Sequence, residues 1–312
     1  MKLLFCTLTL RPYLEPASRE RGIPSPDERR RVWDWLVAHG FDGIDLGETW
    51  LNFYDAPDDE LVAVGQEVRD HGLAIGAVTV LRKIITPPAD EHVQIENRRK
   101  LRRAVEAAAL VGAPIVNMSI SPEPWQVKVR EQDLRGQADP VASSTRADEE
   151  DYRIAAEFLA SLALDAEQQH IGLTLELHQN SIIDTPDRML HLLRHIDHPN
   201  VKVNPDLGNF YFAFATPPCS WEDAVTQLAR HTDFWHVKNI QRVYVESEDR
   251  AYLINAPLDQ GMIDYRRALR MMAAQGFDGW ISIEMAGPGD PFACILAGKE
   301  YLVGLLREIG KT

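Results

Sequence analysis

The sequence predicts an α/β protein whose single domain, residues 1–312, is a (β/α)8 TIM barrel. Short apolar segments alternate with amphipathic helical patterns along the whole chain, and eight such pairs are found. Alternation of this kind produces a parallel sheet with right-handed crossovers. Eight units in 312 residues are typical of a closed barrel rather than an open sheet. No low-complexity segment or linker divides the chain, which favours one domain.

The expected strands are short and apolar, as in sheets that helices cover on both faces. They are 2–10, 41–46, 73–81, 114–120, 171–178, 201–206, 233–239 and 280–284. The first has an alternative interpretation as a secretory signal, because Lys2 precedes an apolar run. That run is only eight residues long and has no small-x-small cleavage site after it, so we expect a buried strand.

The expected helices carry recognisable start and stop signals. Ser25 and Glu28 form a capping box around Pro26, and Gly40 follows the end of the same helix. Gly72 and Gly276 are further stop signals. The expected helices are 26–38, 58–70, 92–110, 149–169, 186–196, 221–231, 265–274 and 292–309.

Two connections are longer than the others, 121–146 and 240–261. Within the second, 242–247 and 251–255 are expected to pair as a hairpin. Both connections follow strands, so both belong on the carboxyl-terminal face of the barrel, where long functional loops are found.

Composition excludes several classes of protein. The chain has 33 Lys+Arg and 47 Asp+Glu, a net charge of −14, which argues against a nucleic-acid backbone as partner. Three scattered cysteines do not form a disulfide framework and indicate a reducing cytoplasm. The most apolar region, 107–116, is too short to span a bilayer, so no membrane partner is expected.

Acidic and imidazole residues stand at the carboxyl ends of four successive expected strands: Glu176, Asp206, His236 and Glu284. Each taken alone is more typical of a solvated loop residue or a satisfied histidine. In a barrel these four strand ends converge, and three buried carboxylates are costly without a cation or protons. The pattern therefore predicts a shared metal site. Its oxygen-rich donor set suits Mn²⁺ best, then Mg²⁺ or Co²⁺, with Zn²⁺ and Fe²⁺ as further options.

Six motifs, in this order, are similar to those of the sugar isomerase/epimerase group of xylose-isomerase-like barrels. They are GFDGIDL (40–46), LTLELH (173–178), NPDLGN (204–209), WHVKN (235–239), PLDQGMIDY (257–265) and GFDGWISIEM (276–285). That superfamily also includes type IV-like apurinic endonucleases, which carry additional zinc-binding histidines. The third and fourth strands here contain no His, and Asn209 stands where one is expected, so DNA repair is rejected.

The resemblance implies roles for the predicted site residues. Glu176, Asp206, His236 and Glu284 correspond to metal ligands that hold two neighbouring oxygens of a keto sugar. Glu176 and Glu284 correspond to an acid/base pair that moves a proton beside the carbonyl through an enediolate. His178 is either an auxiliary acid/base that contacts a substrate hydroxyl or a residue that orients Glu176.

Further residues near the strand ends are expected to contact substrate. Lys238 lies two residues past His236 and should point into the barrel, toward substrate oxygens or toward Glu176 and Asp206. The other expected contacts are Asn209, Asn239, Arg242 and Trp125. For Arg242 the alternative is a solvated side chain, and for Trp125, as for Trp50, it is core or lid packing.

The sequence thus predicts a divalent-metal-dependent isomerase or epimerase that acts on a keto sugar or sugar derivative. A close alternative is a metal-dependent lyase or dehydratase that acts on a 3-keto-glycoside (including a C-glycoside), an inosose or a dehydroshikimate-like substrate. A second alternative is a non-catalytic carbohydrate-binding subunit. The expected partners are a small carbohydrate and further copies of the chain, as a dimer or tetramer, or else a different subunit. Apolar residues at 210–214 and Trp221 are expected either to form a subunit interface or to close the site.

Overall fold

The computed structural model describes residues 1–86, 90–121, 144, 147–179, 181–213, 217–284 and 289–311. Eight parallel strands form one sheet, in the order β6-β5-β4-β3-β2-β1-β10-β7. The strands are β1 Lys2–Cys6, β2 Gly43–Gly47, β3 Ala74–Ile84, β4 Ile115–Ser121, β5 Gly172–Glu176, β6 Val201–Asn204, β7 Phe234–Val237 and β10 Trp280–Ile283. A single parallel bridge, Val203 to Thr232, connects β6 to the start of β7 and nearly closes the barrel. The predicted fold class is confirmed.

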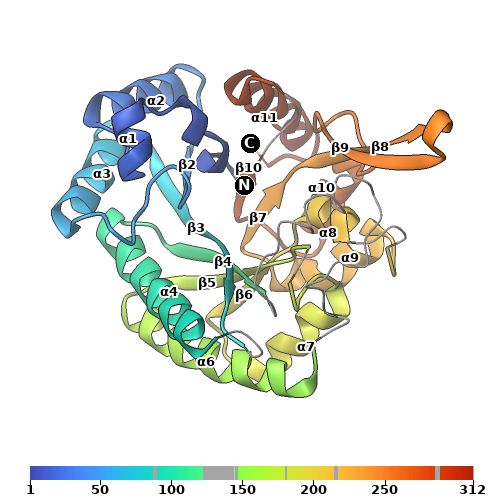
Figure 1. Cartoon of the computed structure of the whole chain (residues 1–312). Coiled ribbons are helices and arrows are strands. Elements are labelled where there is room, and N and C mark those ends of the chain that lie inside the picture. Colours follow the sequence, from blue (N-terminus) through green and yellow to red (C-terminus); the bar gives the residue numbers. More distant parts are fainter. Residues whose placement is uncertain are drawn as a thin grey trace.

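Helices surround the barrel (Figure 1). They are α1 Pro16–Arg21, α2 Pro26–Ala38, α3 Asp58–Asp70, α4 Glu91–Val111, α6 Glu149–Gln168, α7 Pro186–Ile196, α8 Leu207–Ala213, α9 Trp221–Leu228, α10 Tyr265–Ala274 and α11 Pro291–Glu308. The predictions for α2, α3, α7 and α10 match these bounds at both ends, since their caps are local. In α2, for example, Ser25 and Glu28 form the predicted capping box.

The largest differences from the expected elements lie at strand ends. The first strand was expected over 2–10, but β1 ends at Cys6, and Thr7–Thr9 turns as a 3-10 helix. Leu10 beyond it is still buried, so an apolar run alone does not mark where the strand ends. The short helix α8 was not expected, and it begins directly after Asp206, whose Oδ1 accepts hydrogen bonds from the Gly208 and Asn209 amides.

The predicted hairpin is present. Strands β8 (Asn239–Val245) and β9 (Arg250–Ala256) pair antiparallel across the short 3-10 helix Glu246–Glu248. They extend away from the barrel (Figure 1). Trp125 and most of the other long connection lie outside the described residues.

The barrel interior has an apolar layer with a polar layer above it. Leu4, Ala77, Ile115 and Phe234 form a small buried cluster, and Trp280 packs against it. Two residues further along these five strands stand Cys6, Thr79, Asn117, His236 and Ser282, all buried. Because side chains alternate along a strand, the polar residues face the same interior, one layer nearer the carboxyl ends. The fold therefore places a set of polar groups at one end of the barrel.

The apolar residues once expected at an interface are mostly internal. Phe210 and Trp221 are buried, and Tyr211 is only 9% exposed. Helices α8 and α9 turn these three side chains toward the core, and their predicted role in a subunit interface or in closing the site stays a prediction. Within the described part of the chain, no helix combines the length and apolar character needed to cross a bilayer.

Replacing Glu28 by Ala should lower the free energy of unfolding by about 1–3 kcal/mol, because three donors lose their acceptor. Glu28 accepts hydrogen bonds from the Glu15 and Ser25 amides and from the Ser18 hydroxyl. Urea denaturation measures the change, with exposed Asp27→Ala as the matched control. An equal loss in both variants would contradict the prediction.

The same contribution should depend on pH. Burial raises the pKa of Glu28, but hydrogen bonds from Ser18, Glu15 and Ser25 outweigh it and lower the pKa from 4.5 to about 2. The stabilisation is therefore present above about pH 4.5 and is lost as the pH falls toward about 2. Glu28→Ala should flatten this part of the stability curve.

Candidate metal centre

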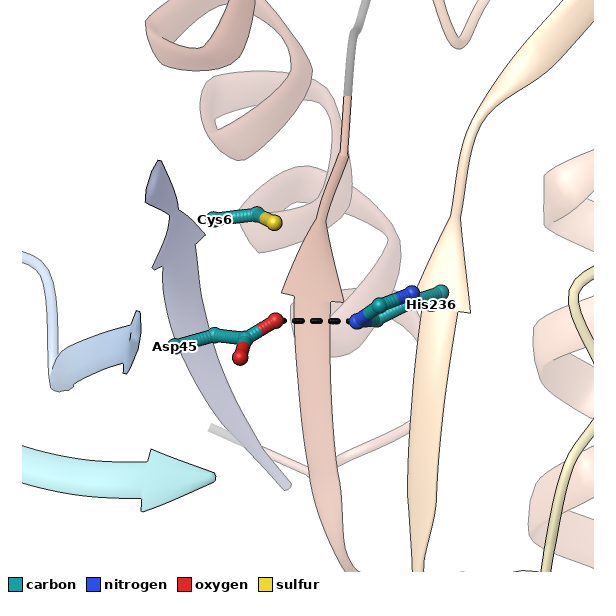
Figure 2. Close-up of side chains that lie close together, drawn as sticks. All are labelled: Cys6, Asp45 and His236. Atoms are coloured by element: carbon teal, nitrogen blue, oxygen red, sulfur yellow. Dashed lines mark hydrogen bonds and ion pairs between the residues drawn. The ribbon is translucent and has the colours of Figure 1, made fainter. Parts of the chain in front are cut away.

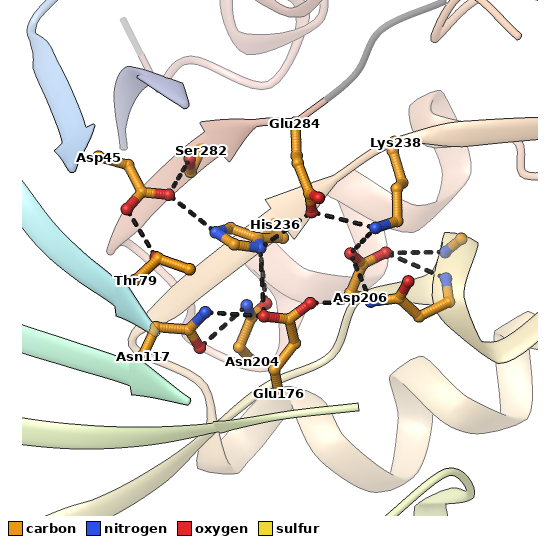
Figure 3. A network of polar contacts seen from close by, with 12 residues as sticks. Asp45, Thr79, Asn117, Glu176, Asn204, Asp206, His236, Lys238, Ser282 and Glu284 are labelled. Carbon is orange, nitrogen blue, oxygen red and sulfur yellow. Dashed lines mark hydrogen bonds and ion pairs between the residues drawn. The ribbon is translucent and has the colours of Figure 1, made fainter. Parts of the chain in front are cut away.

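Four strands bring the predicted ligands together at the carboxyl end of the barrel. Glu176 is the last residue of β5, and His236 lies within β7. Asp206 and Glu284 follow β6 and β10. All four are buried, and one ligand atom from each lies within 4.8 Å of the others. Figure 3 shows their polar ends pointing toward one another.

The imidazole of His236 faces two carboxylates without a hydrogen bond to either. Its Nδ1 lies 3.2 Å from Glu284 Oε2 and 3.5 Å from Glu176 Oε2. This nitrogen makes no hydrogen bond with any described residue, although it is fully buried. A proton or a cation must therefore lie between these atoms, since a bare lone pair beside two carboxylates is unfavourable.

The charges of the buried cluster also leave room for a cation. Four buried carboxylates, on Asp45, Glu176, Asp206 and Glu284, face the ammonium of Lys238 and the imidazole of His236. With all four carboxyl groups ionised, even a protonated His236 leaves an excess of two negative charges. Three oxygen donors and one imidazole suit a divalent cation, so these residues fit the metal that the sequence predicts.

The acidic residues of the cluster respond differently to their surroundings. Burial raises the pKa of Glu176, but neighbouring His236 outweighs it and lowers the pKa to about 2. Burial likewise opposes the ionisation of Glu284, and Lys238 and His236 hold its pKa well below the usual range. For Asp206, burial and the two other carboxylates prevail over Lys238 and raise the pKa to about 7. Both glutamates are thus held ionised.

Lys238 bridges two of the carboxylates, one of the alternatives predicted for it. Its Nζ lies 3.0 Å from Asp206 Oδ2 and 3.0 Å from Glu284 Oε2. Burial lowers the pKa of this amine, but Asp206, Glu284 and Glu176 together raise it well above its ordinary value. Lys238 therefore remains an ammonium and carries a proton next to Glu284.

Asparagine amides hold the carboxylates in place. Asn209 donates through Nδ2 to Glu176 Oε1 at 2.8 Å and to Asp206 Oδ2 at 3.0 Å. Asn117 donates to Glu176 Oε2 at 2.8 Å, and Asn204 accepts from the His236 backbone amide at 2.7 Å. The Oδ1 of Asn209 is buried and makes no hydrogen bond with a described residue. That oxygen is consistent with the predicted substrate contact, which stays a prediction.

A fourth acid, Asp45, stands behind the histidine. Its Oδ2 accepts from His236 Nε2 at 2.9 Å and from the Ser282 hydroxyl at 2.8 Å, and its Oδ1 accepts from Thr79 at 2.6 Å. Figure 2 shows the contact between Asp45 and His236. Because Nε2 donates to this carboxylate, Nδ1 of the neutral ring is free to bind a metal.

Cys6, Asp45 and His236 also have ligand-type atoms close together, but they make a poorer metal site. Metals bind the thiolate, and burial together with Asp45 and Glu284 raises the pKa of Cys6 well above its usual value. The thiol thus stays protonated, and the Asp45 carboxylate is already bonded to His236. The four-residue cluster on the Nδ1 side is the better candidate.

The other residues that were predicted to act near a substrate differ from one another in burial and in their neighbours. His178 is half-buried just past β5, with Nδ1 2.7 Å from the Gln179 carbonyl oxygen, so Nδ1 donates and Nε2 accepts in the neutral ring. Arg242 is exposed on β8 and lies outside the buried cluster. Trp50 is buried and packs edge-on against Trp33, which agrees with the core-packing alternative.

Asn239 serves the fold. Its Nδ2 donates to the carbonyls of Leu258 and Ile263, and its Oδ1 accepts from the Ile240 and Ile263 amides. A Cβ at Gly261 would lie 2.1 Å from the same Oδ1. All its amide capacity is used on backbone, so the side chain holds residues 258–263, and the predicted substrate contact stays a prediction.

Several residues of the site were not assigned a role from the sequence. Asp45, near the end of the expected strand 41–46, had no predicted role, and neither had Asn117, Thr79 and Ser282. The available signal was periodic: Thr79, Asn117 and Ser282 each stand two residues after an inward-facing position on the same strand. Glu48 follows β2 directly and pairs with buried Lys83 at 2.9 Å and with the Tyr54 hydroxyl.

Comparison with known proteins now adds to this geometry. A family model described as xylose isomerase-like TIM barrel matches residues 33–302. The chain belongs to this family. The assignment confirms the resemblance that the six motifs indicated. Proteins similar to this chain include a 3-dehydroshikimate dehydratase and an L-ribulose 3-epimerase.

Three similar proteins show the range of sequence identity and of structural similarity to this chain. The 3-dehydroshikimate dehydratase of Bacillus anthracis is 27% identical over 127 residues, 38% of this chain and 44% of that protein. The chain thus aligns with less than half of that relative. A xylose isomerase-like barrel protein of Mycobacterium smegmatis, in complex with magnesium, superposes with a TM-score of 0.81 at 22% identity, covering 98% of this chain and 97% of that one. An L-ribulose 3-epimerase superposes with a TM-score of 0.73 at 14% identity, covering 98% and 95%.

Asp45→Asn should weaken divalent-metal affinity by about 10–100-fold, because the neutral amide no longer supports the His236 ring with a negative charge. Competition with a chelator measures the affinity. Asp184→Asn is the matched control, since Asp184 is also fully buried but bonds to Ser144 instead. Unchanged affinity in Asp45→Asn, in a folded variant, would contradict the positioning role.

Proposed function

We propose that this protein is a divalent-metal-dependent isomerase or epimerase that acts on a keto sugar or sugar derivative. The observation that carries the proposal is the buried cluster of Glu176, Asp206, His236 and Glu284, with two ionised glutamates on strands three positions apart around the barrel. Two carboxylates that approach one point from separate strands suit the removal and return of a proton on different faces of a substrate.

The residues divide the proton transfer between them. Glu176, held ionised by His236 and oriented by Asn117 and Asn209, accepts the proton from the carbon beside the carbonyl. On the other side Glu284 returns a proton to the substrate, and Lys238 Nζ, 3.0 Å from its Oε2, orients this carboxylate. General acid–base catalysis of this kind contributes about 10²–10⁴-fold.

The metal would be held by Glu176, Asp206, His236 through Nδ1, and Glu284. When bound, it supplies a positive charge that polarises the carbonyl and stabilises negative charge on the substrate oxygens. We favour Mn²⁺ for this donor set, with Mg²⁺, Co²⁺, Zn²⁺ or Fe²⁺ as alternatives. The magnesium complex of the Mycobacterium smegmatis protein supports a divalent metal in this fold.

A lyase or dehydratase is the second candidate. The curated relative is a 3-dehydroshikimate dehydratase, and elimination begins with the same proton removal. For this candidate the second carboxyl group, Glu284, would donate the proton to the departing hydroxyl or glycosidic oxygen. A non-catalytic carbohydrate-binding subunit is the third candidate.

The remaining proposals concern the substrate, the oligomeric state and the cellular location. We propose a small carbohydrate substrate, a homo-oligomer such as a dimer or tetramer, or alternatively assembly with a different subunit, and a cytoplasmic location. The three cysteines are all free, which supports a reducing compartment.

Metal content tests the enzyme proposal. The purified protein should hold one divalent ion per chain at the barrel end, and Glu284→Gln should lose it together with at least about 10²-fold in activity. Asp278→Asn, an exposed change at the opposite end of the same strand, is the control. Elemental analysis and chelator removal provide the readout. A metal-free protein that remains active would overturn the mechanism.

Deuterium labelling separates the two catalytic candidates. Keto sugars, 3-keto-glycosides and 3-dehydroshikimate are incubated with the holoenzyme in D₂O and followed by NMR. Deuterium that enters an intact sugar identifies isomerisation or epimerisation, whereas release of an aglycone or water with a new double bond identifies a lyase. Glu176→Gln should abolish either signal. Turnover of no substrate by metal-loaded protein would favour the binding subunit.

A further inference from the structure

A second group of potential metal ligands lies on the outer wall of the barrel. Helices α6 and α7 pack side by side there (Figure 1). His191 and His195 stand four residues apart on α7, so they share one face of the helix. Glu149 is the first residue of α6 and directs its carboxylate toward both rings. None of these residues belongs to the barrel-end cluster.

The distances among these atoms match those around a metal ion. Glu149 Oε2 lies 3.1 Å from His191 Nε2 and 3.7 Å from His195 Nε2. One ligand atom from each of the three residues lies within 4.8 Å of the others. Tetrahedral ligands at about 2.0–2.1 Å from a zinc ion are separated from one another by about 3.3 Å. Only small side-chain adjustments are needed to place a cation between these atoms.

The surroundings leave Glu149 available to a cation. It is the second of four consecutive acidic residues, and its three neighbours are engaged within α6. Asp148 and Asp151 form a reciprocal capping box, and Glu150 pairs with Arg153. Glu149 reaches across to α7 instead. The local excess of carboxylates adds negative potential at a point where two imidazoles already converge.

The packing fixes the two histidines but leaves them accessible. The His191 ring packs edge-on against Tyr152, with 4.7 Å between ring centroids, and the His191 and His195 rings are 4.6 Å apart. The side chain of His191 is 24% exposed and that of His195 36%. A metal ion can reach the ligands from solvent without unfolding of the wall.

We propose that Glu149, His191 and His195 form a surface site for a late transition-metal ion of the Zn²⁺, Ni²⁺ or Cu²⁺ class. Two imidazoles and one carboxylate favour these ions over Mg²⁺ and Mn²⁺, and the remaining positions are open to water. An ion bound here links the first turn of α6 to α7. The site differs from the barrel-end cluster in both donor set and location, and it does not depend on the proposed catalytic function.

The number of metal ions bound by the unmodified chain, compared with the number bound by a variant without the two histidines, tests the proposal. Titration with Cu²⁺ or Zn²⁺ should show that the unmodified chain binds one equivalent more than the His191→Ala, His195→Ala double variant. This difference holds whether or not the barrel end binds metal, so failure of the proposed function would not hide it. Glu149→Gln should weaken the same binding step by at least tenfold. His92→Ala, which removes an exposed histidine on α4, should keep the full count.

Spectroscopy and melting provide independent readouts. The Cu²⁺ ion that binds to the unmodified chain but not to the double variant should show two nitrogen ligands in its electron paramagnetic resonance spectrum. Saturating Zn²⁺ should raise the melting temperature of the unmodified chain by roughly 2–4 °C more than that of the double variant. Circular dichroism without metal checks that the variants are folded. Equal metal counts in both proteins, or a copper spectrum without nitrogen ligands, would overturn the proposal.

Discussion

The contact between Asp45 and His236 is the interaction around which the polar end of the barrel is arranged. It directs Nε2 toward Asp45, turns Nδ1 toward Glu176 and Glu284, and joins two strands whose residues are 191 positions apart in the chain. Breaking it would leave a buried carboxylate without its imidazole and a ring free to turn. The geometry of the candidate metal centre therefore depends on a residue that does not bind the metal.

The geometry of the barrel provides partners for the carboxylates buried at its polar end. An apolar layer of Leu4, Ala77, Ile115 and Phe234 closes the interior on one side of the polar layer. Buried carboxylates gain little from solvent there, so each needs a partner inside the protein. Asn117, Asn209 and Lys238 provide those partners, and the remaining negative charge is what a divalent cation would balance.

The outer wall of the barrel presents a different set of candidate metal ligands from the barrel end. At the barrel end, strands converge and bury oxygen donors, which suits a hard cation and a polyhydroxylated substrate. On the wall, residues on neighbouring helices bring imidazoles and a carboxylate together at the surface, which suits a softer metal. The two clusters share no residue, so a metal at one need not imply a metal at the other.

Much of the fold and part of the site follow from local sequence. The capping box at Ser25 and Glu28 determined where α2 begins, because its hydrogen bonds lie within one turn. The four ligand positions were evident because each stands at the end of a strand. The sequence also showed the excess of acidic over basic residues, but it did not show which acidic side chains are buried together.

Only the tertiary structure decided how the remaining residues are used. Asn239 was expected to contact substrate, yet its Nδ2 donates to backbone carbonyls 19 and 24 positions away in the chain. Asp45 had no evident role until the barrel brought it to His236, and Glu149 had none until α6 packed on α7. The reason is physical: caps and periodicity act over a few residues, whereas pairing of buried charges depends on which distant strands and helices meet.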